Sequence, residues 1–130
     1  MQNGVLKTTQ ADLRGAGHFV SGGCDPNINN DHITIVANSG ALVAGTVLGK
    51  VTATGFYKAH DPAAVDGSEA AAAILWDDRD NSTATQRAAA VTRGPIAVNG
   101  NSLTFADGIS TVNRDAAVAA LGALGIMVRF

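Results

Sequence analysis

The side chains with the clearest potential for chemistry are the acidic residues of a polar run at positions 77–82, which begins with Asp77. Alternate members of the run have the spacing of the first ligands in a calcium-binding loop: Asp78, Asp80 and Ser82. That loop also requires a glycine at its sixth position and a glutamate at its twelfth, where this chain has Thr83 and Ala89. The run therefore predicts an exposed polar loop and no metal site.

Histidine and cysteine side chains offer little more. His60 precedes Asp61, a pairing that suits base catalysis when the carboxylate orients the imidazole. The chain has no G-x-S-x-G motif, and Cys24 lies in an expected loop without an evident base. The histidines at His18, His32 and His60 do not have the spacing of a zinc site. We therefore expect no catalytic residue, no metal and no cofactor, and a small hydrolase is the least favoured interpretation.

The composition is that of one globular domain. The chain has 130 residues, of which 46% are hydrophobic and 15% are charged, and this length supports one core rather than two. Alanine and valine carry the apolar content, since the aromatic residues are only four Phe, one Tyr and one Trp. Small side chains each remove little apolar surface from water, so such a subunit would gain stability by packing against copies of itself or a partner.

Charge and hydropathy argue against several classes of partner. The formal net charge is −2 and the nine basic residues are scattered, which disfavours binding to nucleic acid. No apolar stretch reaches the length of about 18 residues that a membrane span needs. The N-terminus is polar without a signal core, and the single cysteine, Cys24, cannot form an internal disulfide. We expect a protein made in the cytoplasm that contacts no membrane.

The elements that would position these residues are mostly short strands. Apolar and β-branched runs bounded by turn residues predict strands over 32–37, 46–52, 56–59, 71–76, 88–93 and 96–98, and a shorter one within 15–21. Gly49 inside one of them indicates a bulge or a close backbone approach. Asn99-Gly100-Asn101 predicts a hairpin turn into a return strand at 102–105. Residues 25–31 are rich in turn formers and predict a loop.

One helix is expected, near the C-terminus. Ser110 or Thr111 would cap it, and Gly125 is well placed to end it in a left-handed conformation. Four residues would form its apolar face: Val112, Val118, Leu121 and Leu124. Residues 126–130 again have strand character. The fold class is therefore α+β: a small β-rich single domain with one C-terminal helix.

The N-terminal part and the single tryptophan are further candidates for function. Residues 1–14 are polar without sustained periodicity, which is typical of a flexible arm. We place an extended arm at 1–21 and a single β-rich domain at 22–130. The arm ends in a short stretch able to pair with a foreign strand edge: His18, Phe19, Val20 and Ser21. Trp76 lies at the end of the apolar strand at 71–76, a position that favours an anchor in the core or at a subunit interface over a platform for ligands.

An ordered series of short segments covers about residues 15 to 129. It includes Leu42-x-Ala44-Gly45-Thr46-Val47-Leu48-Gly49-Lys50-Val51, Tyr57, Asp61-Pro62-Ala63-Ala64-x-Asp66-Gly67-Ser68-Glu69, Ala73-Ile74-Leu75 and Ala120-Leu121-Gly122-Ala123-Leu124-Gly125-Ile126-x-Val128-Arg129. Shorter members are Phe19-Val20-Ser21, Ile33-Thr34-Ile35, Arg93-Gly94, Val98-Asn99-Gly100 and Leu103-Thr104. No single motif is specific, but the series resembles the lambda-type bacteriophage head decoration family. The chain departs from the family pattern in the loop at 22–30 and at Ala73, where glycine is common.

The resemblance implies a structural protein with a β-clip-like sheet or barrel, and not an enzyme. Its members sit as homotrimers at three-fold and quasi-three-fold positions on the outer surface of the expanded phage head. There they clamp neighbouring subunits of the major capsid protein against the pressure of internal DNA, and the N-terminal arm orders on the capsid. Applied to the arm of this chain, it implies that His18, Phe19, Val20 and Ser21 bind the capsid. From its place in the sequence, Trp76 is expected to contact a neighbouring subunit or a partner. The alternative is a small β-clip or barrel module that binds a ligand or a carbohydrate.

Overall fold

Five strands close into a small barrel. The computed structural model describes residues 16–80 and 82–130, so expectations for residues 1–15 lie outside this part of the chain. The barrel strands follow the order β2-β4-β3-β5-β6, and their bounds are Asn30–Ile35 (β2), Val47–Lys50 (β3), Tyr57–Ala59 (β4), Ala71–Leu75 (β5) and Gln86–Val91 (β6). All neighbours pair antiparallel except β2 and β4, which are parallel. The expected strands at these positions are confirmed.

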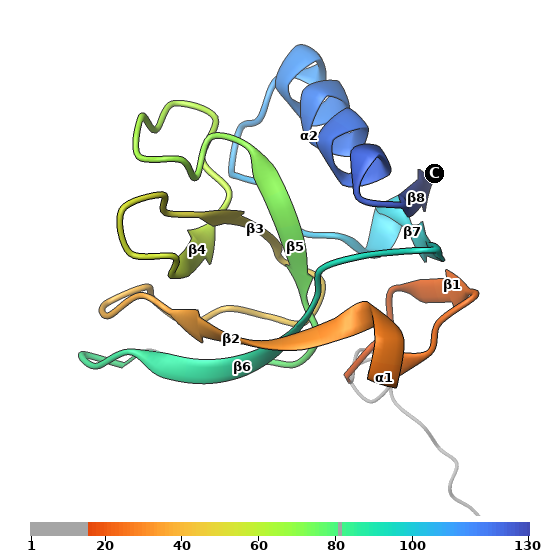
Figure 1. The fold of residues 1–130 in the computed structure, drawn as a ribbon. Coiled ribbons are helices and arrows are strands. Elements are labelled where there is room, and N and C mark those ends of the chain that lie inside the picture. Colours follow the sequence, from red (N-terminus) through yellow and green to blue (C-terminus); the bar gives the residue numbers. More distant parts are fainter. Residues whose placement is uncertain (1–15, 81) are drawn as a thin grey trace, which may run out of the picture.

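A three-stranded sheet stands beside the barrel (Figure 1). Its strands are β1 (Val20–Gly22), β7 (Ile96–Asn99) and β8 (Ile126–Arg129), in the order β1-β7-β8. β7 pairs antiparallel with β1 and parallel with β8. A parallel pair needs a crossover connection, and α2 (Thr111–Ala123) supplies most of it. The remaining elements are α1 (Pro26–Asn29) and a 3₁₀ turn, η2 (Gly100–Ser102).

The core has two clusters of buried side chains that meet at β5. One fills the barrel and contains Ile33, Ile35, Leu42, Leu48, Ala73, Leu75, Ala88 and Ala90. The other lies between the barrel, the sheet and α2, and contains Phe19, Val47, Ala71, Ile74, Val91, Ile96, Val98, Leu103, Ala117, Leu121 and Ile126. Alternate residues of a strand point to opposite faces, so β5 is covered on both sides. This explains its unbroken apolar sequence.

The expected helix is confirmed, but part of its expected apolar face is wrong. The Ser110 side chain accepts a hydrogen bond from the Asn113 amide at 3.1 Å, and Gly125 ends the helix with φ +87°. The buried residues are Ala117 and Leu121, spaced one turn apart, whereas Val112 is 77% exposed. The small Ala117 lets the helix lie close to the sheet, so only a narrow stripe is covered.

The expected hairpin at Asn99-Gly100-Asn101 is wrong. Residues 100–102 form η2, and the Asn99 side chain caps it by accepting a hydrogen bond from the Asn101 amide at 3.0 Å. β7 already has β1 on one side and β8 on the other, so neither edge is free for a return strand at 102–105. That segment instead meets the barrel, where Thr104 forms an isolated parallel bridge with Thr46.

The expected loop at 25–31 is also only partly correct, because it contains α1 and the start of β2. Asn29 holds it in place and is only 1% exposed. Its side-chain oxygen accepts from the Asp25 amide at 2.6 Å, and its amide group donates to the carbonyls of Arg93 and Pro95 at 3.0 and 3.3 Å. One buried amide thus joins α1 to the turn before β7.

With these elements in place, the expected α+β class is confirmed: a β-rich domain with a closed five-stranded barrel and one long helix near the C-terminus. None of the helices in the described ranges is long and apolar enough to span a bilayer.

Candidate functional site

The residues predicted to end the capsid-binding arm lie in the fold. Phe19 is fully buried in the cluster beneath the sheet, and Val20 and Ser21 belong to β1. Val20 pairs with Val98 of β7, so its backbone already takes part in a sheet. The predicted arm boundary after residue 21 is therefore wrong, since burying Phe19 ties these residues to the core. Ser21 alone of this group is exposed to solvent.

Trp76 fixes the point where the N-terminal part joins the domain. Its ring meets Phe19 edge to face, with centroids 6.0 Å apart, and Phe19 meets His18 in the same way at 5.7 Å. The Gly17 amide donates to the Trp76 carbonyl at 2.9 Å, and a Cβ on Gly17 would lie 2.6 Å from the indole. Trp76 is half-buried and anchors residues 17–19, so its indole ring is not an open platform for a sugar.

Two carboxylates of the acidic run are engaged in backbone hydrogen bonds. The Asp78 carboxylate accepts from the Ala44 amide at 2.7 Å, and the Asp77 carboxylate accepts from the Asp78 amide at 2.8 Å. These bonds hold the loop against the segment before β3. Across residues 16–80 and 82–130, no group of three His, Cys, Asp or Glu side chains is placed to hold a metal ion.

His60 and Asp61 do not form the pair that base catalysis would need. His60 is 3% exposed, and its Nε2 lies 3.0 Å from the carbonyl oxygen of Glu69. The Asp61 carboxylate instead accepts from the Ala63 amide at 3.0 Å. Burial, and secondarily the charge of Asp25, raises the pKa of the Cys24 thiol, which disfavours the thiolate that a nucleophile requires.

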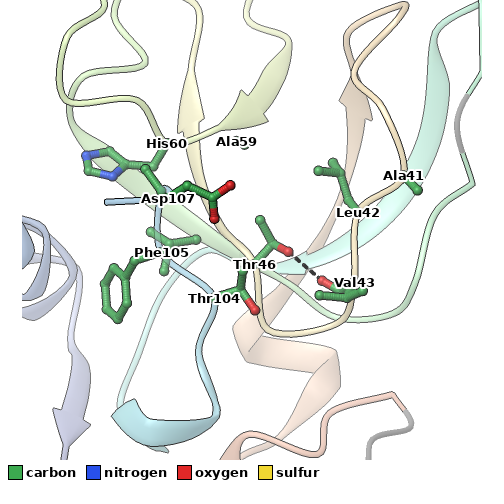
Figure 2. Close-up of a pocket in the computed structure, with 11 residues that line it drawn as sticks. Ala41, Leu42, Val43, Thr46, Ala59, His60, Thr104, Phe105 and Asp107 are labelled. Carbon is green, nitrogen blue, oxygen red and sulfur yellow. Dashed lines mark hydrogen bonds between the residues drawn. The ribbon is translucent and has the colours of Figure 1, made fainter. Parts of the chain in front are cut away.

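A hollow of about 230 Å³ lies at one end of the barrel (Figure 2). Figure 2 shows the Asp107 carboxylate turned towards it and the His60 ring turned away. The Thr46 hydroxyl, on its floor, donates to the Val43 carbonyl at 2.7 Å, so this polar group is already satisfied. The rest of the lining is mainly apolar, and the arrangement offers no pair of groups for acid–base chemistry.

The loop between β4 and β5 is a feature that the sequence analysis named only among the segments of the family resemblance. Asp66 accepts hydrogen bonds from the Ser68 hydroxyl at 2.6 Å and the Ser68 amide at 3.0 Å, and it pairs with Lys58 at 3.3 Å. These bonds, led by the Ser68 hydroxyl, lower the pKa of Asp66 to about 2. Glu69 accepts from the Gly67 amide at 2.8 Å.

Gly67 and Gly49 bring this loop against β3. Gly67 has φ +108°, and a Cβ there would collide with Lys50 and Thr52; a Cβ on Gly49 would collide with the backbone of Ser68. The expectation of a bulge or a close approach at Gly49 is confirmed in both senses, since the pairing with β5 shifts register there. The Asp-Gly-Ser-Glu spacing was a readable signal for this ordered loop.

The outer face of the three-stranded sheet is the second feature that the sequence reasoning missed. Ala97 pairs with Met127, and Asn99 with Arg129, while the alternate residues of β7 face the core. The period-two pattern of these strands was the available signal. Which of the two faces would be covered depended on the position of α2.

Comparison with known proteins supplies the remaining finding. The chain matches a family model described as bacteriophage lambda head decoration protein D over residues 8–126. A search of curated proteins finds no significant match. The match ends at Ile126, the first residue of β8, so it covers the barrel, β1, β7 and α2 together.

Proposed function

The chain belongs to the bacteriophage lambda head decoration protein D family, and from this we propose that it binds as a trimer at the three-fold and quasi-three-fold sites of an expanded phage head and stabilises it against DNA pressure. The family is one of structural head proteins and not of enzymes. Its role is capsid decoration, which locates the protein on the virion. The proposed partners are the major capsid protein and further copies of this chain, and synthesis takes place in the host cytoplasm.

The observation that carries this proposal is the extent of the family match, residues 8–126 of 130. The geometry is compatible with a structural role. Asp61 and Asp77 use their carboxylates in local backbone hydrogen bonds, and Asp78 accepts from the distant Ala44 amide. Trp76 packs on Phe19 of the same fold. The alternative of a carbohydrate-binding module has no comparable support from Trp76.

Electron microscopy of heads tests the proposal directly. Heads assembled without the chain are mixed with purified protein and imaged beside undecorated heads. We expect added density over the three-fold and quasi-three-fold positions, and higher resistance of DNA-filled heads to heating. Density elsewhere on the shell, or none at saturating protein, would contradict the proposed mode of binding.

The capsid contact is proposed to lie in the segment before Ala16. An extended peptide can add a strand to a sheet edge, with main-chain hydrogen bonds supplying affinity. Since Phe19 belongs to the core, the informative truncation removes residues 1–15 and keeps 16–130. This variant should unfold at the same temperature as the full chain and bind heads much more weakly.

A deletion of residues 1–20 is the matched control. It also removes Phe19, whose loss from a core costs roughly 3–5 kcal/mol, and should lower the melting temperature. If the 16–130 protein binds heads as tightly as the full chain, the capsid contact lies on the globular body.

A further inference from the structure

Val65 stands at the tip of an ordered loop with its side chain in solvent. It is 96% exposed, while its neighbours on both sides are tied down by Asp61, Asp66 and Glu69 through hydrogen bonds of 2.6 to 3.0 Å. The Thr52 amide adds a bond to the Asp66 carbonyl at 2.9 Å. The loop therefore holds an isopropyl group outward in a fixed position. A lone exposed valine is ordinary on a protein surface. It indicates a binding contact only if a complementary surface exists.

A matching surface is present on the outer face of the sheet. An apolar hollow of about 340 Å³ is lined by Gly22, Gly23, Pro95, Ile96, Ala97 and Met127. Met127 is 51% exposed at its edge, and a Cβ on Gly22 would have no heavy atom within 4 Å. The hollow is thus open to solvent and lined by apolar groups, which suits a small branched side chain.

A polar hollow adjoins it and shares Ala97. Its lining includes Ser21, Asn99, Asn101 and Arg129. Arg129 takes part in none of the ion pairs found among the described residues. The sheet face therefore has an apolar end beside an end with a cation and amide groups. The loop has the complementary pair, a valine with the exposed Asp61 nearby and with Asp66, which also pairs with Lys58, beside it.

The two surfaces cannot meet within one molecule. Figure 1 shows the loop between β4 and β5 on the opposite side of the fold from β1, β7 and β8. The occupant with the right chemistry is therefore a second copy of this chain. We propose that the Val65 loop of one copy docks on the outer face of the β1-β7-β8 sheet of the next, with Val65 in the apolar hollow and the loop carboxylates near Arg129.

Such a contact joins two different surfaces, so it is heterologous and either closes into a ring or continues as a filament. That the ring closes with three copies rests on the proposed function. The contact itself is independent of that function, because it is inferred from the shapes and charges of the two surfaces.

Disulfide trapping tests the contact. Cys24→Ser removes the native thiol, and Val65→Cys with Ala97→Cys then places one thiol on each surface. Under mild oxidation we expect covalent dimers and trimers on a non-reducing gel, both for concentrated free protein and for decorated heads. The control replaces Val65→Cys by Val112→Cys, another exposed valine that lies on α2, and should stay monomeric.

Charge insertion gives an independent measurement. Val65→Asp and Met127→Asp should each weaken self-association by roughly tenfold or more in sedimentation equilibrium, because each places a charge in an apolar contact. Val112→Asp should leave it unchanged. An equal mixture of the first two variants retains one intact contact between unlike chains, so it should form one-to-one pairs and no closed ring.

Absence of cross-linked species in both settings, with association unaffected by Val65→Asp, would overturn the contact. So would cross-links from position 65 to the capsid protein alone, which would assign the loop to a different partner. Head binding by the wild-type chain tests the proposed function separately, so failure of one is distinguishable from failure of the other.

Discussion

The barrel and the three-stranded sheet bury their side chains in opposite ways. The barrel closes on itself, so each of its five strands has two neighbours and its interior is filled by its own residues. The sheet has only three strands, with outer strands β1 and β8, and it depends on α2 and on β5 to cover its inner face. Closed sheets have no edge to offer a partner, whereas open ones do. The barrel is therefore closed by its own pairing, whereas the sheet keeps two open edges, at β1 and β8.

The largest expected effect concerns whether the two regions unfold together. Leu121 is fully buried between α2 and the sheet, so Leu121→Ala should lower the free energy of unfolding by roughly 2–5 kcal/mol. Because β5 belongs to the barrel and also packs on this cluster, we expect one cooperative transition in which both regions melt at a lower temperature. Calorimetry together with far-UV circular dichroism measures this.

Val112→Ala on the exposed side of the same helix is the control, and its effect should stay within about 0.5 kcal/mol. Two separate transitions in Leu121→Ala would contradict this expectation and show that the sheet and α2 form an independent unit.

The next effect contrasts a crowded glycine of the barrel with an open glycine of the sheet. Gly49→Ala places a methyl group against the backbone of Ser68, so it should cost roughly 1–3 kcal/mol. It should also loosen the loop that carries Val65. Gly22→Ala meets no heavy atom within 4 Å and should be nearly neutral in a thermal melt. Equal effects at the two sites would mean that the loop between β4 and β5 can move away from β3 at little cost in stability.

The smallest expected effect is a pH dependence that belongs to the loop. Asp66 has a pKa of about 2 in the folded protein against an ordinary value of 3.8, so its ionised form favours folding. Its contribution is therefore complete above about pH 4 and is lost as pH falls towards about 2. Asp66→Asn should be less stable than the wild type at neutral pH, and the difference should shrink over this window.

Urea unfolding at several pH values measures that difference, with Asp107→Asn as the control for net charge. A difference that stays constant from neutral pH to pH 2 would show that the amide loses a contact unrelated to ionisation. The effect is small because the Asp66 side chain is exposed and that of Lys58 is partly exposed, so salt screens the pair.

Much of the fold could be predicted because local signals and tertiary packing agree. The segment Ala71–Leu75 becomes β5, although alanine favours helices, because turn residues bound it and it is covered on both sides. Ser110 and Gly125 define the ends of α2 through capping geometry that depends on neighbouring residues alone. Gly49 marked a close approach for the same reason, since only glycine leaves room for another backbone.

The sequence by itself determined the α+β class, the positions of most strands, the one long helix and the family. Only the tertiary structure decided what each short segment contacts. Asn99-Gly100 is a strong local turn signal, yet β7 has both edges occupied and the chain turns into η2 instead. The sequence places Phe19 at the end of an extended arm, whereas in the structure Trp76 and the core beneath the sheet enclose it. Val65 and the outer face of β7 and β8 are ordinary in sequence, because complementarity between distant surfaces has no local signature.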